Sequence, residues 1–207
     1  MFTKFGGAAT LAVSALIAAA PAQAATVFQS NFQGATFTLT QNSATSATFD
    51  IAGVNNLTGN WSTASFLGAF SFNGLGVSAA TATLLGGGST TNSQSGGLNA
   101  NGCNGNGAGF ICFDLSPNVA IAGKNNLTFD LLATSGIFNI SAPHLKILWS
   151  NSASRDNKVG DLYSQDLKFV GNVGGVPEPA TWAMMIFGFG AVGGMMRIRQ
   201  RKVRYAV

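Results

Sequence analysis

The feature that most constrains this chain is a repeated alternation of apolar and polar residues, in short runs separated by glycine and asparagine. A period of two places successive side chains on opposite faces of an extended strand, so the pattern predicts β-strands. No run of useful length between residues 25 and 175 has the helical period. Nine strands are predicted, at Phe28–Phe32, Thr36–Thr40, Thr48–Ile51, Phe66–Phe72, Val77–Leu84, Phe110–Leu115, Leu127–Leu132, Ile137–Ile140 and Leu145–Trp149.

The apolar residues of these strands predict the core. Several of them fall on one face at period two: Phe37, Leu39, Phe49, Ile51, Leu127, Phe129, Leu131, Leu145, Ile147 and Trp149. Strands of this kind without helices favour an all-β fold, an antiparallel β-sandwich that is jelly-roll-like. The segment Gly86–Gly109 is rich in Gly and Asn and is expected to be a long loop.

Both ends of the chain are expected to be targeting segments. Lys4, the apolar stretch Ala8–Ala20 and the small-residue site Ala22, Gln23 and Ala24 have the order of a signal peptide. Cleavage there would make Ala25 the first residue of the mature chain. The predicted organisation is a signal peptide (1–24), a β-sandwich body (25–175) and a C-terminal segment (176–207).

The charge of the body differs from that of the whole chain. The formal charge of +4 comes from the two ends, because residues 25–175 carry six Asp against five Lys and Arg. A body with a net charge near −1 offers no electrostatic footprint for nucleic acid. Its length of about 150 residues is suited to one domain with its own core.

The C-terminal segment joins three elements in a fixed order. Val176, Pro177, Glu178 and Pro179 are followed by Trp182 and Ala183, and no charge occurs from Ala180 to Met196. Seventeen residues of helix span about 25 Å, slightly less than the roughly 30 Å hydrocarbon core, so a short transmembrane helix is expected. A basic stop-transfer cluster follows, which predicts a cytoplasmic end: Arg197, Arg199, Arg201, Lys202 and Arg204.

These residues resemble the PEP-CTERM sorting domain of Gram-negative bacteria, in its PEP-x-x-W-A form. The resemblance implies Sec-dependent export, transient retention in the inner membrane and processing by an exosortase. It further implies release to the cell surface, extracellular matrix or medium, in cells that build an exopolysaccharide biofilm. An ordinary single-span anchor is the alternative, but it leaves the Pro-Glu-Pro and Trp spacing unexplained.

The only two cysteines, Cys103 and Cys112, are expected to form a disulfide, because the chain is exported and they are close in sequence. A metal site is disfavoured since two Cys and one distant His do not complete a four-ligand zinc set. The spacing also differs from the Cys-x-x-Cys of redox sites.

Catalytic signals are weak, and neither catalytic residues, a metal nor a cofactor is expected. His144 is the only histidine and lies at the start of a predicted strand, where a structural or solvated role is expected. No Gly-x-Ser-x-Gly elbow occurs. Paired-carboxylate chemistry would have to use Asp alone, because the body has no Glu. Asp156, Asn157, Asp161 and Asp166 could hold calcium, but a solvated loop is favoured over that reading.

An exposed aromatic ring could stack on a sugar, and the candidates are Trp61 and Tyr163. Trp149 is assigned to the core because it shares a face with Leu145 and Ile147. The leading hypothesis is a non-enzymatic structural or adhesive protein of the cell surface or matrix, with extracellular polysaccharide as a possible partner. The alternatives are a carbohydrate-binding module and, third, a glycoside hydrolase that uses two Asp.

Overall fold

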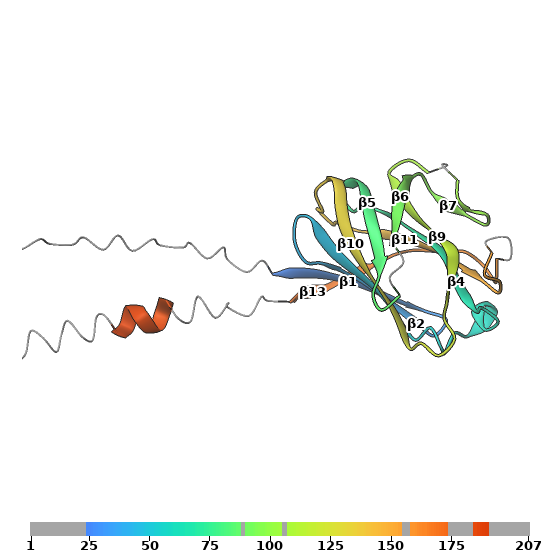
Figure 1. Cartoon of the computed structure of the whole chain (residues 1–207), viewed down its shortest axis with the longest axis horizontal. Coiled ribbons are helices and arrows are strands. Elements are labelled where there is room, and N and C mark those ends of the chain that lie inside the picture. Colours follow the sequence, from blue (N-terminus) through green and yellow to red (C-terminus); the bar gives the residue numbers. More distant parts are fainter. Residues whose placement is uncertain (1–23, 88–89, 105–106, 155–157, 174–183, 191–207) are drawn as a thin grey trace, which may run out of the picture. The chain divides into compact units, whose positions relative to one another are not determined.

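The computed structural model describes residues 24–87, 90–104, 107–154, 158–173 and 184–190. Within the body these residues form β-strands and one 3-10 helix, η1 (Gly59–Trp61) (Figure 1). The strands are β1 (Ala25–Phe32), β2 (Ala35–Gln41), β3 (Ser46–Ala52), β4 (Phe66–Asn73), β5 (Val77–Leu84), β6 (Thr90–Ser95), β7 (Leu98–Asn99), β8 (Gly102–Cys103), β9 (Phe110–Ala120), β10 (Asn126–Gly136), β11 (His144–Ser150), β12 (Tyr163–Asp166) and β13 (Lys168–Val173).

Alternation in the sequence becomes alternation in burial. In β2 and β3 the side chains of Phe37, Leu39, Phe49 and Ile51 are fully buried, whereas the residues between them are partly exposed. Strand β4 differs, because every residue from Leu67 to Phe72 is buried. Two clusters explain this: one face of β4 joins the main core, and Ala69 on the other face packs in a smaller cluster of Leu98, Cys112 and Leu148. All ten predicted core residues are buried.

Eleven of the strands form one antiparallel sheet in the order β12-β11-β4-β9-β6-β5-β10-β3-β2-β1-β13. Strand β6 connects its two halves, since Thr90–Asn92 pair with β5 and Ser93–Ser95 pair with β9. The terminal strands β12 and β13 are consecutive in the chain and are separated only by the buried residue Leu167. The sheet therefore curves until its two edges nearly meet.

The two halves of the curved sheet face each other (Figure 1), and aromatic side chains pack between them. The ring of Phe49 in β3 lies 5.1 Å from that of Phe70 and 4.9 Å from that of Phe72, both in β4. Phe70 in turn lies 4.9 Å from Phe113 of β9. The predicted all-β antiparallel class is thus confirmed, in the form of one continuous sheet that nearly closes into a barrel-like shape, and the separate sheets of a β-sandwich are not observed among the described residues. The jelly-roll connectivity stays a prediction.

Eight of the nine predicted strands are present, and Ile137–Ile140 is not a strand. Its alternation is real, because Phe138 and Ile140 are buried. However, the Phe138 N–H donates to Ala44 and the Asn139 N–H to Leu75, so the segment crosses between strands and joins no ladder.

The prediction of a long loop at Gly86–Gly109 is also wrong in part, since this segment contains β6, β7 and β8. Strands β12 and β13 were not predicted. Their burial explains this, because most of their side chains are exposed and carry no alternating apolar signal.

Candidate functional site

A groove of about 500 Å³ lies at one end of the half-sheet formed by β4, β9, β11 and β12. We call it the His144 groove. It is lined by Asn73, Gly74, Phe110, Ala142, His144, Lys146, Ser164 and Asp166.

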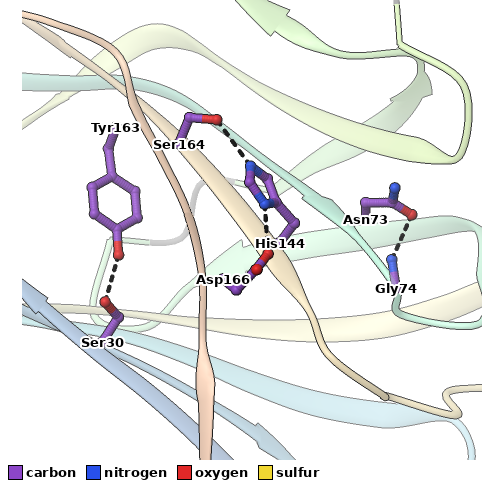
Figure 2. Close-up of polar contacts among 7 residues, drawn as sticks. All are labelled: Ser30, Asn73, Gly74, His144, Tyr163, Ser164 and Asp166. Carbon is purple, nitrogen blue, oxygen red and sulfur yellow. Dashed lines mark hydrogen bonds and ion pairs between the residues drawn. The ribbon is translucent and has the colours of Figure 1, made fainter.

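The register of β11 and β12 gathers the polar side chains of the groove. His144 pairs with Asp166, and Lys146 pairs with Ser164. Residues two apart on a strand share a face, so these four side chains lie on the same side of the sheet. Figure 2 shows the imidazole of His144 between Ser164 and Asp166.

His144 is held through both ring nitrogens. Its Nδ1 lies 2.7 Å from Asp166 Oδ1, and its Nε2 lies 2.9 Å from Ser164 Oγ (Figure 2). An ionised carboxylate can only accept hydrogen bonds, so Nδ1 must carry the proton that faces Asp166. In the neutral imidazole Nε2 is then the acceptor, and the hydroxyl of Ser164 donates to it.

A cation and an amide complete the groove. The Nζ of Lys146 lies 4.5 Å from the centroid of the Phe110 ring, a cation–π distance, and that ring meets the His144 ring edge-on at 5.7 Å. Among the described residues, no carboxylate forms an ion pair with Lys146. The Oδ1 of Asn73 accepts the N–H of Gly74 at 2.7 Å, which leaves the NH₂ as the group that Asn73 can offer to a ligand.

The two predicted sugar-stacking residues are buried, which corrects that prediction. Trp61 is fully buried in η1, and its Nε1 donates to the carbonyl oxygen of Asp161 at 3.0 Å. Tyr163 is 2% exposed and donates from its hydroxyl to Ser30 Oγ at 2.7 Å (Figure 2). Neither ring presents a face to solvent. Burial raises the pKa of Tyr163, the hydrogen bond with Ser30 opposes the rise, and the charge of Asp166 adds to it.

The predicted disulfide between Cys103 and Cys112 is present. It links β8 to β9, and Cys112 is fully buried beside Leu98. The bridge therefore fixes the short β7-β8 hairpin on the outer side of β4 and β9.

The carboxylates considered for calcium have separate contacts where the structure describes them. Asp161 accepts from the Nδ2 of Asn60 at 2.9 Å, and Asp166 contacts His144. Asp156 and Asn157 lie outside the described residues. In the described part of the chain, no group of three or more His, Cys, Asp or Glu residues is placed to hold a metal ion.

Sequence reasoning placed His144 at a strand edge but missed its partners. Ser164 and Asp166 are two residues apart, a spacing that puts both on one face if the segment is a strand. That signal was available, but no apolar alternation marked β12 as a strand.

Most of the predicted targeting residues lie outside the described residues. These are residues 1–23 of the predicted signal peptide, the predicted sorting residues Val176, Pro177, Glu178, Pro179, Trp182 and Ala183, and the predicted basic residues Arg197, Arg199, Arg201, Lys202 and Arg204. Of the predicted transmembrane segment, only residues 184–190 are described, and they are helical. No helix within the described residues has the length and apolar character needed to cross a membrane.

Comparison with known proteins bears on the C-terminal segment alone. No curated protein and no solved structure matches the chain. One family model does match, and it implies an exported, exosortase-sorted protein that is associated with the cell surface. Residues 175–202 are a PEP-CTERM protein-sorting motif, which marks the chain as an exosortase substrate.

Proposed function

We propose that the body is a structural or adhesive component of the cell surface or extracellular matrix, and that it binds hydroxyl-rich polysaccharide through a polar face on the outside of its curved sheet. In this proposal the Sec pathway exports the chain, residues 1–24 are removed, and the C-terminal helix holds it in the inner membrane until exosortase acts. The body of residues 25–175 then reaches the surface, matrix or medium.

The observation that carries this proposal is the outward face of β1, β2, β3, β10, β5 and β6, which we call the Thr face. Cross-strand pairing places its side chains in rows. One row runs across six strands through Val27, Thr40, Thr48, Asp130, Thr83 and Thr90, and a second runs through Gln29, Thr38, Asp50 and Thr128.

The Thr face offers hydrogen-bonding groups on a regular grid. Neighbouring strands lie about 4.8 Å apart, and outward side chains recur about every 6.8 Å along a strand. Side-chain hydrogen bonds hold several members in place, such as Thr128 Oγ1 to Asp50 Oδ1 at 2.6 Å and Gln29 Nε2 to Thr38 Oγ1 at 3.2 Å. Apart from Leu132, which is exposed on the same face, its groups are mainly hydroxyls and amides with few charges. Such a face suits many weak hydrogen bonds to a polymer, and the affinity then grows by multivalency.

The test uses intact mass and fractionation of the protein from an exosortase-bearing host and from its exosortase deletion strain. We expect a chain that starts at Ala25 and ends near the Pro-Glu-Pro box, with this truncation absent from the deletion strain. A full-length tail in both strains would refute the sorting steps of the proposal.

A second arm tests adhesion with a variant that removes hydroxyls without changing shape, Thr40→Val/Thr48→Val/Thr83→Val. We expect the processed triple variant to move from the matrix fraction to the medium. The matched control, Asn101→Ala/Asn151→Ala, changes exposed polar residues away from the Thr face and should leave retention unchanged. Equal retention of both variants would remove the Thr face from the proposal.

A further inference from the structure

We propose that the His144 groove is an ester-hydrolysing site, in which Ser164 is the nucleophile, His144 the general base and Asp166 the residue that positions the imidazole. This activity goes beyond a structural or adhesive role and does not depend on it. Three observations carry it: the contacts of His144, the cation of Lys146 in the same groove, and the opening of this groove to solvent.

The contacts of His144 have the order that nucleophilic catalysis requires. Asp166 holds Nδ1 at 2.7 Å and so fixes the tautomer, which leaves Nε2 to accept from Ser164 Oγ at 2.9 Å. A hydroxyl whose proton already faces a base at this distance is activated as a nucleophile. A purely structural cross-strand pair needs only one of these two contacts. The register of β11 and β12 supplies both, because Ser164 and Asp166 flank the imidazole on one strand.

The second observation is a positive charge in the same groove as the nucleophile. Lys146 is directly opposite Ser164 in the register, so their Cβ atoms are separated by about 5 Å. Phe110 supports the ammonium group at 4.5 Å without neutralising it. In ester hydrolysis negative charge develops on the carbonyl oxygen, and a donor placed there lowers the barrier. In the proposed reaction the flexible Lys146 side chain turns from Phe110 toward that oxygen, and the NH₂ of Asn73 is a second donor in the same groove.

The reaction balances without a metal or a cofactor. Ser164 Oγ attacks the carbonyl carbon of the ester as its proton passes to His144 Nε2, and the C=O electron pair moves onto the oxygen. The tetrahedral intermediate then collapses, the bond between the carbonyl carbon and the alcohol oxygen breaks, and His144 gives the proton to that oxygen. Water then attacks the acyl-serine by the same route, so one ester and one water give one acid and one alcohol.

The groove indicates the class of substrate. It is polar and open to solvent, and its one aromatic ring is covered on one face by Lys146. It has no deep apolar slot for a long acyl chain among its lining residues. Short acyl esters, such as O-acetyl groups on a hydroxylated polymer, match this shape. The Asp166 side chain is 73% exposed, so solvent screens its charge and a modest rate is expected, most easily seen with activated esters.

The test uses the processed, exported protein with two probes, a fluorophosphonate and p-nitrophenyl acetate. We expect one fluorophosphonate adduct, located at Ser164 by peptide mass, and ester hydrolysis about 10²-fold faster than that of Ser164→Ala. His144→Gln should lose as much as Ser164→Ala. The control Ser135→Ala removes an exposed strand serine whose hydroxyl accepts a hydrogen bond from Ser78, and it should change neither the adduct nor the rate.

The role of Asp166 needs a readout that a structural contact would not change. We expect Asp166→Asn to lower kcat about tenfold or more with KM unchanged, and Asp166→Glu to recover part of the loss. Equal denaturation midpoints for all variants would show that the fold is intact. No adduct, together with hydrolysis by the unmodified protein within threefold of Ser164→Ala, would overturn the proposal and leave the contacts of His144 a structural pair.

Discussion

Replacement of Trp61 tests whether its ring stabilises the core or binds sugar. The side chain is fully buried, packs 5.1 Å from the Phe32 ring and 5.8 Å from the Trp149 ring, and donates to the carbonyl of Asp161. Truncation of a buried Trp to Ala costs about 3–5 kcal/mol, and a lost hydrogen bond adds about 1 kcal/mol. We expect Trp61→Ala to lower the free energy of unfolding by about 4–6 kcal/mol, a large share of the roughly 5–15 kcal/mol of a typical domain.

Two further variants sharpen this expectation. Trp61→Phe keeps an aromatic ring but loses the N–H group and part of the packing, so a loss of about 1–2 kcal/mol is expected. Phe169→Ala is the matched control, because this strand aromatic is 58% exposed and its truncation should cost less than about 1 kcal/mol.

The assay is urea denaturation followed by far-ultraviolet circular dichroism, since fluorescence would lose one of its reporters in the variants. Retention of Trp61→Phe in the matrix fraction is measured in parallel and should equal that of the unmodified protein. If Trp61→Ala changed stability by less than about 1 kcal/mol and abolished polysaccharide binding, the ring would be a surface platform and the core described above would be wrong.

Three other changes test the core, the disulfide and the buried tyrosine. Phe49→Ala removes a ring that contacts Phe70, Phe72 and Phe129, and urea denaturation should show a loss of about 3–5 kcal/mol; a loss under about 1.5 kcal/mol would contradict the packing of the two half-sheets. Reduction of the Cys103–Cys112 bridge opens a ring of about ten residues and should cost about 2–3 kcal/mol, with no effect of reductant on the Cys103→Ala/Cys112→Ala variant; an equal response of both proteins would show that the reductant acts elsewhere. The pKa of Tyr163 is raised on folding, so its contribution to stability is complete below the unfolded value of about 10 and is lost as the pH rises through the folded value. Unfolding measured from pH 8 to 11 should therefore show a smaller alkaline loss of stability for Tyr163→Phe than for the unmodified protein. At neutral pH this variant should lose about 1 kcal/mol, because its hydrogen bond to Ser30 is absent. An equal dependence of stability on pH in both proteins would refute the raised pKa of Tyr163.

Sequence patterns found the strands that bury one face and missed those that bury little. In β2 and β3 each inward residue is apolar and each outward residue is polar, so period two is visible in the letters. The side chains of β6, which connects the half-sheets, are all exposed or partly exposed. Strand β13 lies at an edge of the sheet, and its side chains are mostly exposed without alternation. Hydrophobic alternation measures burial, and backbone pairing without burial leaves no such trace.

The candidate site was harder to predict because its contacts join distant segments. Trp61 lies between Asn60 and Ser62, a polar setting typical of exposed turns. Its ring is nevertheless buried, and its indole N–H donates to the carbonyl oxygen of Asp161, a hundred residues away. The disulfide could be predicted, since an exported chain with two nearby cysteines leaves few alternatives. The partners of His144 depend on the pairing of β11 with β12, which no local pattern specified.

The closure of the sheet and the geometry of the His144 groove depend on the same residues. Leu167 separates β12 from β13, is buried, and donates its N–H to the carbonyl of Pro143 at 2.8 Å. Pro143 directly precedes His144, and Leu167 directly follows Asp166, so this one backbone hydrogen bond ties together the residues that flank the His144–Asp166 pair. The chain passes from one edge of the sheet to the other at Leu167, so the closure of the sheet and this hydrogen bond depend on the same residue. The side chains of the groove are exposed or partly exposed, but the buried residue Leu167 fixes the backbone beside them. This gives the groove the rigidity that a defined site needs.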